Sequence, residues 1–120
     1  TRAQAEKMLR NLLDMGAKSA VVTSLPLEDG LANAYMRRED GQMGVCAFER
    51  LDAHYPGTGD LFASVLTGAL LRGEGLEDAV GRATDFTRLC VRRSMRFSTP
   101  VNYGVDLEPL LPRLWEKGAE

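Results

Sequence analysis

The hydrophobic period of this 120-residue chain changes twice, and this change limits the folds open to it. Near the start, apolar residues repeat with the 3.6-residue period of an amphipathic helix, which predicts a helix over about residues 4–15. From residue 19 to residue 49 they fall into short runs that are typical of strands. Helical spacing then returns after residue 60. The order of helix, strands and helices indicates an α/β fold.

Three runs are predicted strands. Residues 19–23 form a short β-branched run that we expect to be a buried, parallel-type strand, followed by a turn over residues 25–30. Residues 31–37 and 43–49 flank an Asp-Gly pair, which is typical of a β-hairpin. One strand and a hairpin make a thin sheet for so many helices. We therefore expect an N-terminal portion, outside this sequence, to supply further strands.

Helices are predicted for most of the remaining chain. One should end near Gly73, and a second continues with strict three- and four-residue spacing. Asp106 is placed to cap a last helix that contains Pro109 and Pro112. The apolar positions that mark the first two helices are Leu61, Phe62, Val65, Leu66, Ala69 and Leu70, and then Leu76, Ala79, Val80, Ala83, Phe86, Thr87, Cys90 and Val91.

The composition narrows the kinds of partner. Apolar residues make up 44% of the chain and charged residues 27%, so a core can form. The net charge is -2 and the basic residues are scattered, which argues against a nucleic-acid surface. No apolar run approaches the roughly 20 residues of a membrane span. Cys46 and Cys90 lie in apolar stretches and are expected to be buried free thiols, which favours a cytoplasmic location.

The segment with the clearest chemistry is Gly57-Thr58-Gly59-Asp60, directly before a predicted helix. Glycine allows a positive φ angle and lets a ligand approach the backbone closely. The first turn of a helix has unpaired N–H groups and a partial positive charge, which suit a phosphate. Asp60 in that turn could orient a hydroxyl group and accept its proton.

The alternative interpretation of these four residues is purely structural. Thr58 or Asp60 could cap the helix while the glycines only shape a turn. The segment is not a Walker A loop, because no Gly-Lys-Ser/Thr follows it. It is not a dinucleotide fingerprint either, because Phe62 occupies the position of the third glycine.

The longer string Pro56-Gly57-Thr58-Gly59-Asp60-Leu61-Phe62-Ala63-Ser64-Val65 resembles the C-terminal signature of the ribokinase-like superfamily, and within it the pyridoxal/pyridoxamine kinases. This resemblance implies the C-terminal part of a three-layer α/β/α fold with a β-hairpin. Residues 1–120 would then be the C-terminal, ATP-binding and catalytic portion of a single kinase domain, with the N-terminal portion absent.

The resemblance also implies roles for the four residues of the turn. Gly57, Thr58 and Gly59 would form the anion hole for the transferring phosphoryl group. Asp60 would be the catalytic base that activates the 5'-hydroxymethyl group of the substrate.

Residues outside the turn gain roles from the same resemblance. Thr23 and Ser24 would lie by the ATP phosphates or a bound monovalent cation. Leu51, Ala53 and Tyr55 would line the adenine side of the ATP site. Ordinary turn residues, in the first case, and plain packing, in the second, are the structural alternatives.

The function implied is ATP-dependent phosphorylation of pyridoxal, pyridoxamine or pyridoxine, with Mg²⁺, by an enzyme that is often a homodimer. Related acceptors are a sugar, a nucleoside or a hydroxymethylpyrimidine. Sugar kinases more often have Ala at the position of Thr58, and hydroxymethylpyrimidine kinases typically have Cys at that of Asp60, which favours a pyridoxal-type enzyme. A non-catalytic α/β module is the alternative of another class. We expect these 120 residues alone to be inactive.

Overall fold

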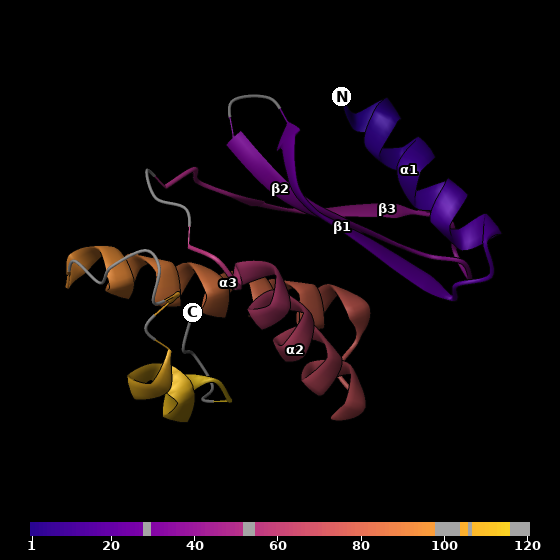
Figure 1. The fold of residues 1–120 in the computed structure, drawn as a ribbon. Coiled ribbons are helices and arrows are strands. Elements are labelled where there is room, and N and C mark those ends of the chain that lie inside the picture. Colours follow the sequence, from indigo (N-terminus) through magenta and orange to yellow (C-terminus); the bar gives the residue numbers. More distant parts are fainter. Residues whose placement is uncertain (28–29, 52–54, 98–103, 106, 116–120) are drawn as a thin grey trace. The chain divides into compact units, whose positions relative to one another are not determined.

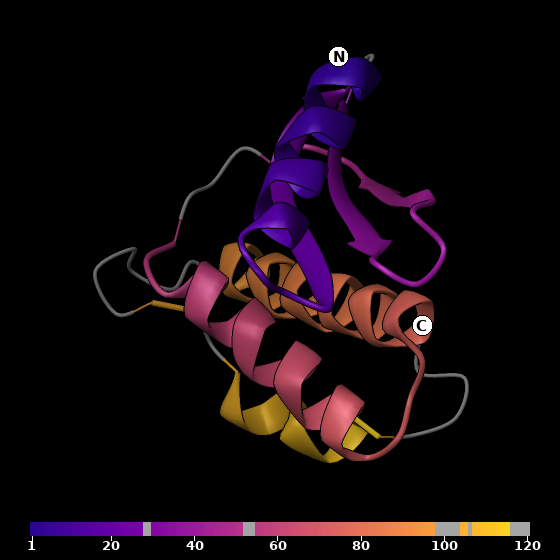
Figure 2. The same cartoon turned by 90° about the vertical axis from the view of Figure 1, so that its right-hand side faces the viewer.

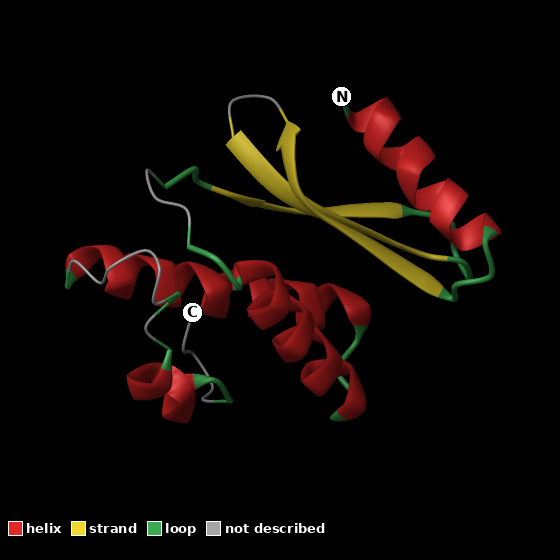
Figure 3. Ribbon diagram, in the orientation of Figure 1, coloured by secondary structure: helices red, strands yellow, loops and turns green. Residues whose placement is uncertain are grey.

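The computed structural model describes residues 1–27, 30–51, 55–97, 104–105 and 107–115. The elements follow one another in the order α1, β1, β2, β3, α2, α3 and η2, a 3₁₀ helix (Figures 1 and 3). The chain divides into two compact units, Thr1–Arg50 and Leu51–Glu120. The mixed α/β class predicted from the hydrophobic periods is therefore confirmed.

The first unit begins with helix α1 (Arg2–Asp14). The Thr1 side chain accepts a hydrogen bond from the Gln4 N–H, and the Gln4 side chain bonds back to Thr1, so both residues form a capping box. Gly16 follows the helix with a φ of 116°, which is the predicted glycine stop.

The sheet of the first unit contains β1 (Ser19–Leu27), β2 (Gly30–Arg37) and β3 (Met43–Phe48), in that order and all antiparallel. The predicted hairpin is confirmed as β2 and β3. The predicted parallel-type strand is wrong, because β1 pairs antiparallel with β2. The turn predicted over 25–30 is wrong for residues 25–27, which belong to β1, and for Gly30, which begins β2, while residues 28 and 29 lie outside the described residues. Pro26 is tolerated within β1 because β1 lies at the edge of the described sheet.

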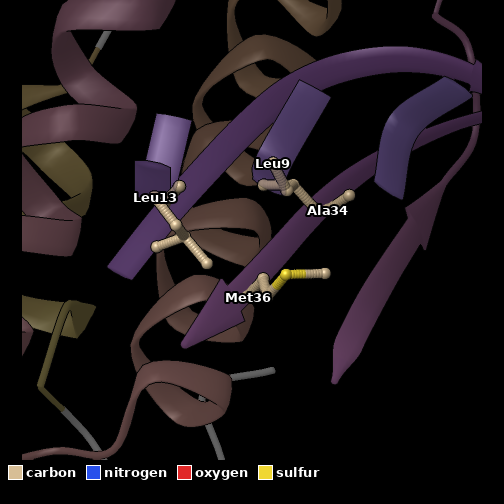
Figure 4. Close-up of a cluster of buried hydrophobic side chains, with 5 residues drawn as sticks. Leu9, Leu13, Ala34 and Met36 are labelled. Atoms are coloured by element: carbon tan, nitrogen blue, oxygen red, sulfur yellow. The ribbon is translucent and has the colours of Figure 1, made fainter. Parts of the chain in front are cut away.

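Helix α1 packs against β1 and β2, and the core of this unit lies between them. Leu9 and Met36 have no exposed surface, and Leu13 and Ala34 pack beside them (Figure 4). The buried cluster is completed by Ala20, with Val22, Leu25 and Met43 partly buried at its border. The apolar stripe of α1 therefore packs against one face of the sheet.

The second unit is built on helices α2 (Thr58–Leu71) and α3 (Leu76–Arg96), which pack side by side (Figure 2). Gly73 follows Arg72, the C-cap residue of α2, and has a φ of 92°, as a glycine helix stop requires. Most of the apolar positions predicted for these helices are buried, while Leu70 is 41% exposed. The buried positions are Phe62, Val65, Ala69, Leu76, Ala79, Val80, Ala83, Phe86, Cys90 and Val91.

The last element differs from the prediction. It is a 3₁₀ helix, η2 (Glu108–Arg113), and Leu107 lies at its N-cap. Pro109 and Pro112 lack the N–H groups that a regular α-helix needs, which explains the short, tight geometry. Asp106, the predicted cap, lies outside the described residues.

The end of this segment is fixed against α2 and α3. Arg82 Nη1 donates to the Leu114 carbonyl oxygen at 2.6 Å. The guanidinium groups of Arg72 and Arg82 lie over the Trp115 ring, 4.3 and 5.1 Å from its centroid. Charge–π contacts therefore help to hold a segment that buries little apolar surface.

Both cysteines are free thiols, as predicted. Cys90 is buried. Cys46 is only half-buried, and it lies in β3, an outer strand of the described sheet. None of the helices in the described part of the chain has the length and apolar character needed to span a membrane.

Candidate active site

The predicted anion site lies at the start of α2. Gly57 is the N-cap residue and has a φ of 88°, in the left-handed region that favours glycine. The Leu61 N–H donates to the Gly57 carbonyl oxygen at 2.9 Å, which is the first hydrogen bond of the helix. No side chain caps this end. The backbone N–H groups of the first turn are therefore free of a side-chain acceptor that would compete with a bound anion.

The Asp60 side chain, predicted to be the base, is accessible. Asp60, Gly57 and Gly59 are exposed, and Thr58 is half-buried. The apolar side of the same helix is anchored in the second unit, where Phe62 and its neighbours are buried. Helix α2, packed through its apolar side, therefore presents the Asp60 carboxylate and the first-turn amides at its uncapped end.

Gly57 and Gly59 differ in whether the backbone conformation requires glycine. Gly57 needs its positive φ angle, which side-chain-bearing residues rarely adopt. Gly59 lies inside α2 at a position with no such requirement, and no neighbouring atom lies within 4 Å of the place a Cβ would take. Folding alone therefore does not explain glycine at 59, whereas a close ligand would.

Gly104 lies against the entrance to this turn. It has a φ of 75°, and a Cβ added to it would lie 3.4 Å from the Pro56 carbonyl oxygen. The chain near residue 104 thus approaches the backbone just before Gly57.

Thr23 and Ser24, the predicted phosphate or cation residues, form an irregularity in β1. The flanking partners in the sheet are Val22 with Ala34 and Leu25 with Ala32. Two residues of β1 therefore lie opposite one residue of β2, Asn33, which is the arrangement of a β-bulge. Both bulge residues are exposed, and Ser24 has a φ of 57°.

Asn33 is a residue that sequence reasoning missed. It is 4% exposed, and its Oδ1 accepts a hydrogen bond from the Ser24 N–H at 2.9 Å. One signal could have found it, since asparagine is depleted in strands and needs a reason to lie within one.

The predicted adenine-side residues are described only in part. Leu51 is half-buried and Tyr55 is 4% exposed, and both belong to the second unit. Ala53 lies outside the described residues. Their role in nucleotide binding stays a prediction.

The structure thus places the predicted residues in two groups. Gly57, Thr58, Gly59 and Asp60 are joined in one turn of the second unit, and the Thr23–Ser24 bulge belongs to the first. Within the described residues, no three His, Cys, Asp or Glu side chains gather into a metal site.

Comparison with known proteins agrees with the motif. Residues 1–104 match the family model described as phosphomethylpyrimidine kinase. A comparison with curated protein sequences gave no significant match.

Solved structures match over nearly the whole chain. A protein from Bacteroides thetaiotaomicron assigned as a phosphomethylpyrimidine kinase is 33% identical, with a TM-score of 0.90 over 95% of this chain and 40% of its own. Pyridoxal kinase from Lactobacillus plantarum is also 33% identical, with a TM-score of 0.80 over 91% of this chain and 40% of its own. Pyridoxal kinase from Entamoeba histolytica, 21% identical with a TM-score of 0.79 over 100% of this chain and 41% of its own, shows the same fold.

This chain spans about 40% of the length of the solved structures it matches. The family match covers most of the chain, and the neighbours are phosphomethylpyrimidine and pyridoxal kinases of the ribokinase-like fold. The chain therefore belongs to the phosphomethylpyrimidine kinase family.

Proposed function

We propose that the protein transfers the γ-phosphoryl group of ATP to the 5'-hydroxymethyl group of pyridoxal, pyridoxamine or pyridoxine. The observation that carries the proposal is the open end of α2, where Asp60 stands beside uncapped first-turn amides behind a left-handed glycine. The sequence of this turn resembles the pyridoxal kinase signature, and one solved neighbour is a pyridoxal kinase. The Bacteroides neighbour was also crystallised with pyridoxal.

Asp60 would act as the base in this reaction. Its carboxylate accepts the proton of the substrate hydroxyl as that oxygen bonds to the γ-phosphorus. The bond between the γ-phosphorus and the bridging oxygen breaks, and ADP leaves with that electron pair. Because the transition state is loose, Asp60 mainly orients the hydroxyl until late in the transfer.

The backbone of the turn would stabilise the transferring group. Charge accumulates on the three outer oxygens of the phosphoryl group during transfer. The first-turn N–H groups of α2, from Thr58 to Asp60, have no side-chain cap and carry the positive end of the helix dipole. Glycine at 59 leaves space for those oxygens to come close to the backbone.

The remaining ATP contacts would come from the residues that the resemblance assigns. Thr23 and Ser24 are exposed on the bulge of β1 and carry hydroxyl groups that can donate to phosphate oxygens or bind a monovalent cation. Leu51 and Tyr55 would contribute apolar surface on the adenine side. Mg²⁺ would arrive on the nucleotide phosphates, where it commonly has few protein ligands.

The test is Asp60→Asn in the complete encoded protein. We expect the rate of ATP-dependent pyridoxal phosphorylation to fall about 10²- to 10⁴-fold, because the amide cannot accept the proton. Binding of a fluorescent ATP analogue should stay within about twofold, since Asp60 contacts the acceptor and not the nucleotide.

The matched control is Asp78→Asn. Asp78 is also an exposed aspartate in the first turn of a helix, in this case α3. It loses the same favourable interaction with the helix dipole but has no proposed catalytic role. Unchanged turnover in Asp60→Asn, or an equal loss in both variants, would remove Asp60 from the role of base.

A second acceptor is favoured by one finding, the match to a phosphomethylpyrimidine kinase family model. The proposed chemistry would be the same with a hydroxymethylpyrimidine as acceptor. A panel of pyridoxal, hydroxymethylpyrimidine, a sugar and a nucleoside, compared by kcat/KM, separates these substrates. Absence of phosphorylation with every acceptor, together with absence of ATP binding, would instead favour a non-catalytic module.

A further inference from the structure

A buried asparagine lies next to the proposed phosphate contacts of β1. Asn33 is 4% exposed in the middle of β2, whereas Thr23 and Ser24, on the neighbouring strand, are exposed. Asn33 alternates with Ala32 and Ala34, so its side chain belongs to the opposite face of the sheet from theirs. Ala34 lies in the core beneath α1. The packing of α1 therefore does not account for an asparagine at position 33.

The backbone at Ser24 is unusual. Among the described residues, Ser24 is the only non-glycine with a positive φ, at 57°. Such a conformation is unfavourable for a side-chain-bearing residue and persists only when its surroundings impose it. Thr23 and Ser24 both lie opposite Asn33, so the bulge has one residue more than the partner strand can pair with in the regular ladder.

A hydrogen bond connects these two features. The Ser24 N–H donates to Asn33 Oδ1 at 2.9 Å, across the strand pair and at the bulge itself. The asparagine side chain thus takes the place of the backbone carbonyl that a regular ladder would offer to this N–H. An alanine, leucine or valine at 33 would leave the strand intact but remove the acceptor.

We propose that Asn33 is a positioning residue for ATP: by holding the Ser24 N–H, it keeps the Thr23–Ser24 bulge in the one shape that presents both hydroxyl groups to the nucleotide phosphates. This inference rests on the proposed kinase function. Asn33 itself touches no reacting atom in this scheme. It acts through Ser24, so its loss should weaken ATP binding and leave the acceptor site unaffected.

The experiment compares Asn33→Ala and Asn33→Leu with the wild type in the complete encoded protein. Both variants lose the acceptor, and leucine keeps the branching at Cγ and the number of side-chain heavy atoms, so the pair separates loss of the bond from loss of packing. We expect KM for ATP to rise about three- to tenfold in both, the effect of one lost hydrogen bond. The KM for pyridoxal should not change, and kcat should change less than about twofold.

Ser94→Ala provides the matched control. Ser94 is a fully buried polar residue whose hydroxyl donates to the Cys90 carbonyl oxygen at 2.9 Å within α3. Its loss removes a buried side-chain hydrogen bond and should lower the melting temperature without changing KM for ATP. A rise in KM for ATP specific to the Asn33 variants supports the proposal.

The remaining outcomes are also decisive. An unchanged KM for ATP in a folded Asn33 variant, or failure of both Asn33 variants to fold, would assign Asn33 to stability alone and overturn the proposal. A wild-type protein that phosphorylates none of the acceptors and does not bind the fluorescent ATP analogue would overturn the proposed function first, and this inference with it.

Discussion

At the scale of single residues, the turn before α2 contains two glycines with different physical demands. Gly57 adopts a φ of 88°, so any other residue there would strain the backbone. Gly59 lies in the first turn of α2, where its flexibility only weakens the helix. The stability of the helix therefore does not account for glycine at position 59.

Gly59→Ala should therefore separate stability from function. We expect the variant to be more stable by about 0.5–1 kcal/mol, because alanine is the better helix former and its Cβ meets no neighbouring atom. We also expect KM for ATP to rise about tenfold, because the methyl group occupies the space proposed for a phosphoryl oxygen. Thermal denaturation and steady-state kinetics measure the two effects.

Gly81→Ala is the control for this prediction. Gly81 lies within α3, and its Cβ would likewise meet no atom within 4 Å. It should gain stability with unchanged kinetics. If Gly59→Ala shows the same pattern as Gly81→Ala, the first turn of α2 does not receive a phosphate.

At the scale of elements, the hairpin of β2 and β3 depends on a close cross-strand pair. Tyr35 lies opposite Gly44, and its ring occupies the place that a side chain at 44 would take. An aromatic ring over a glycine on the neighbouring strand is a known way to stabilise a sheet and fix its register.

Gly44→Ala should destabilise the protein by about 1–3 kcal/mol, because the added methyl group forces the Tyr35 ring out of its place. Urea denaturation of the single variants and of Gly44→Ala with Tyr35→Ala tests the pair. The double variant should lose less stability than the two single variants lose together, since it no longer contains the clash. Fully additive costs would show that the ring does not fix the hairpin.

The elements that follow from local pattern were predictable, and those set by distant partners were not. Helices α2 and α3 and the β2–β3 hairpin follow directly from hydrophobic period and an Asp-Gly pair. The length of β1 was missed, because Pro26 is typical of a turn and only its place at the sheet edge makes it acceptable. The 3₁₀ geometry of η2 was also missed, although Pro109 and Pro112 were its cause.

The candidate site shows the same division. The 57–60 turn could be proposed as an anion site from sequence because its residues are contiguous in the chain. Thr23 and Ser24 came only from resemblance, and the Ser24 N–H bonds to Asn33, nine residues away in the sequence and on another strand. Local propensity contains no information on such a pairing.

At the scale of the whole molecule, the chain contains two units whose proposed contributions are complementary. The unit Thr1–Arg50 contains the Thr23–Ser24 bulge, and the unit Leu51–Glu120 contains the proposed base and anion site. The roles proposed for both groups concern ATP and the transferred phosphoryl group. None of the described residues has been assigned to recognition of the vitamin ring, and the chain spans about 40% of the length of the kinases it matches.

This distribution predicts that a polypeptide of these 120 residues does not turn over pyridoxal. Positioning of the acceptor supplies much of the rate of a two-substrate transfer, so the anion site and base alone should give less than about a thousandth of the rate of an intact pyridoxal kinase. The measurement is ATP-dependent phosphorylation of pyridoxal by the purified 120-residue chain, with circular dichroism to show that it is folded. Asp60→Asn in the same polypeptide shows whether any residual rate comes from this site. Turnover comparable to an intact kinase, lost in Asp60→Asn, would show that these residues form a complete active site and would contradict the prediction.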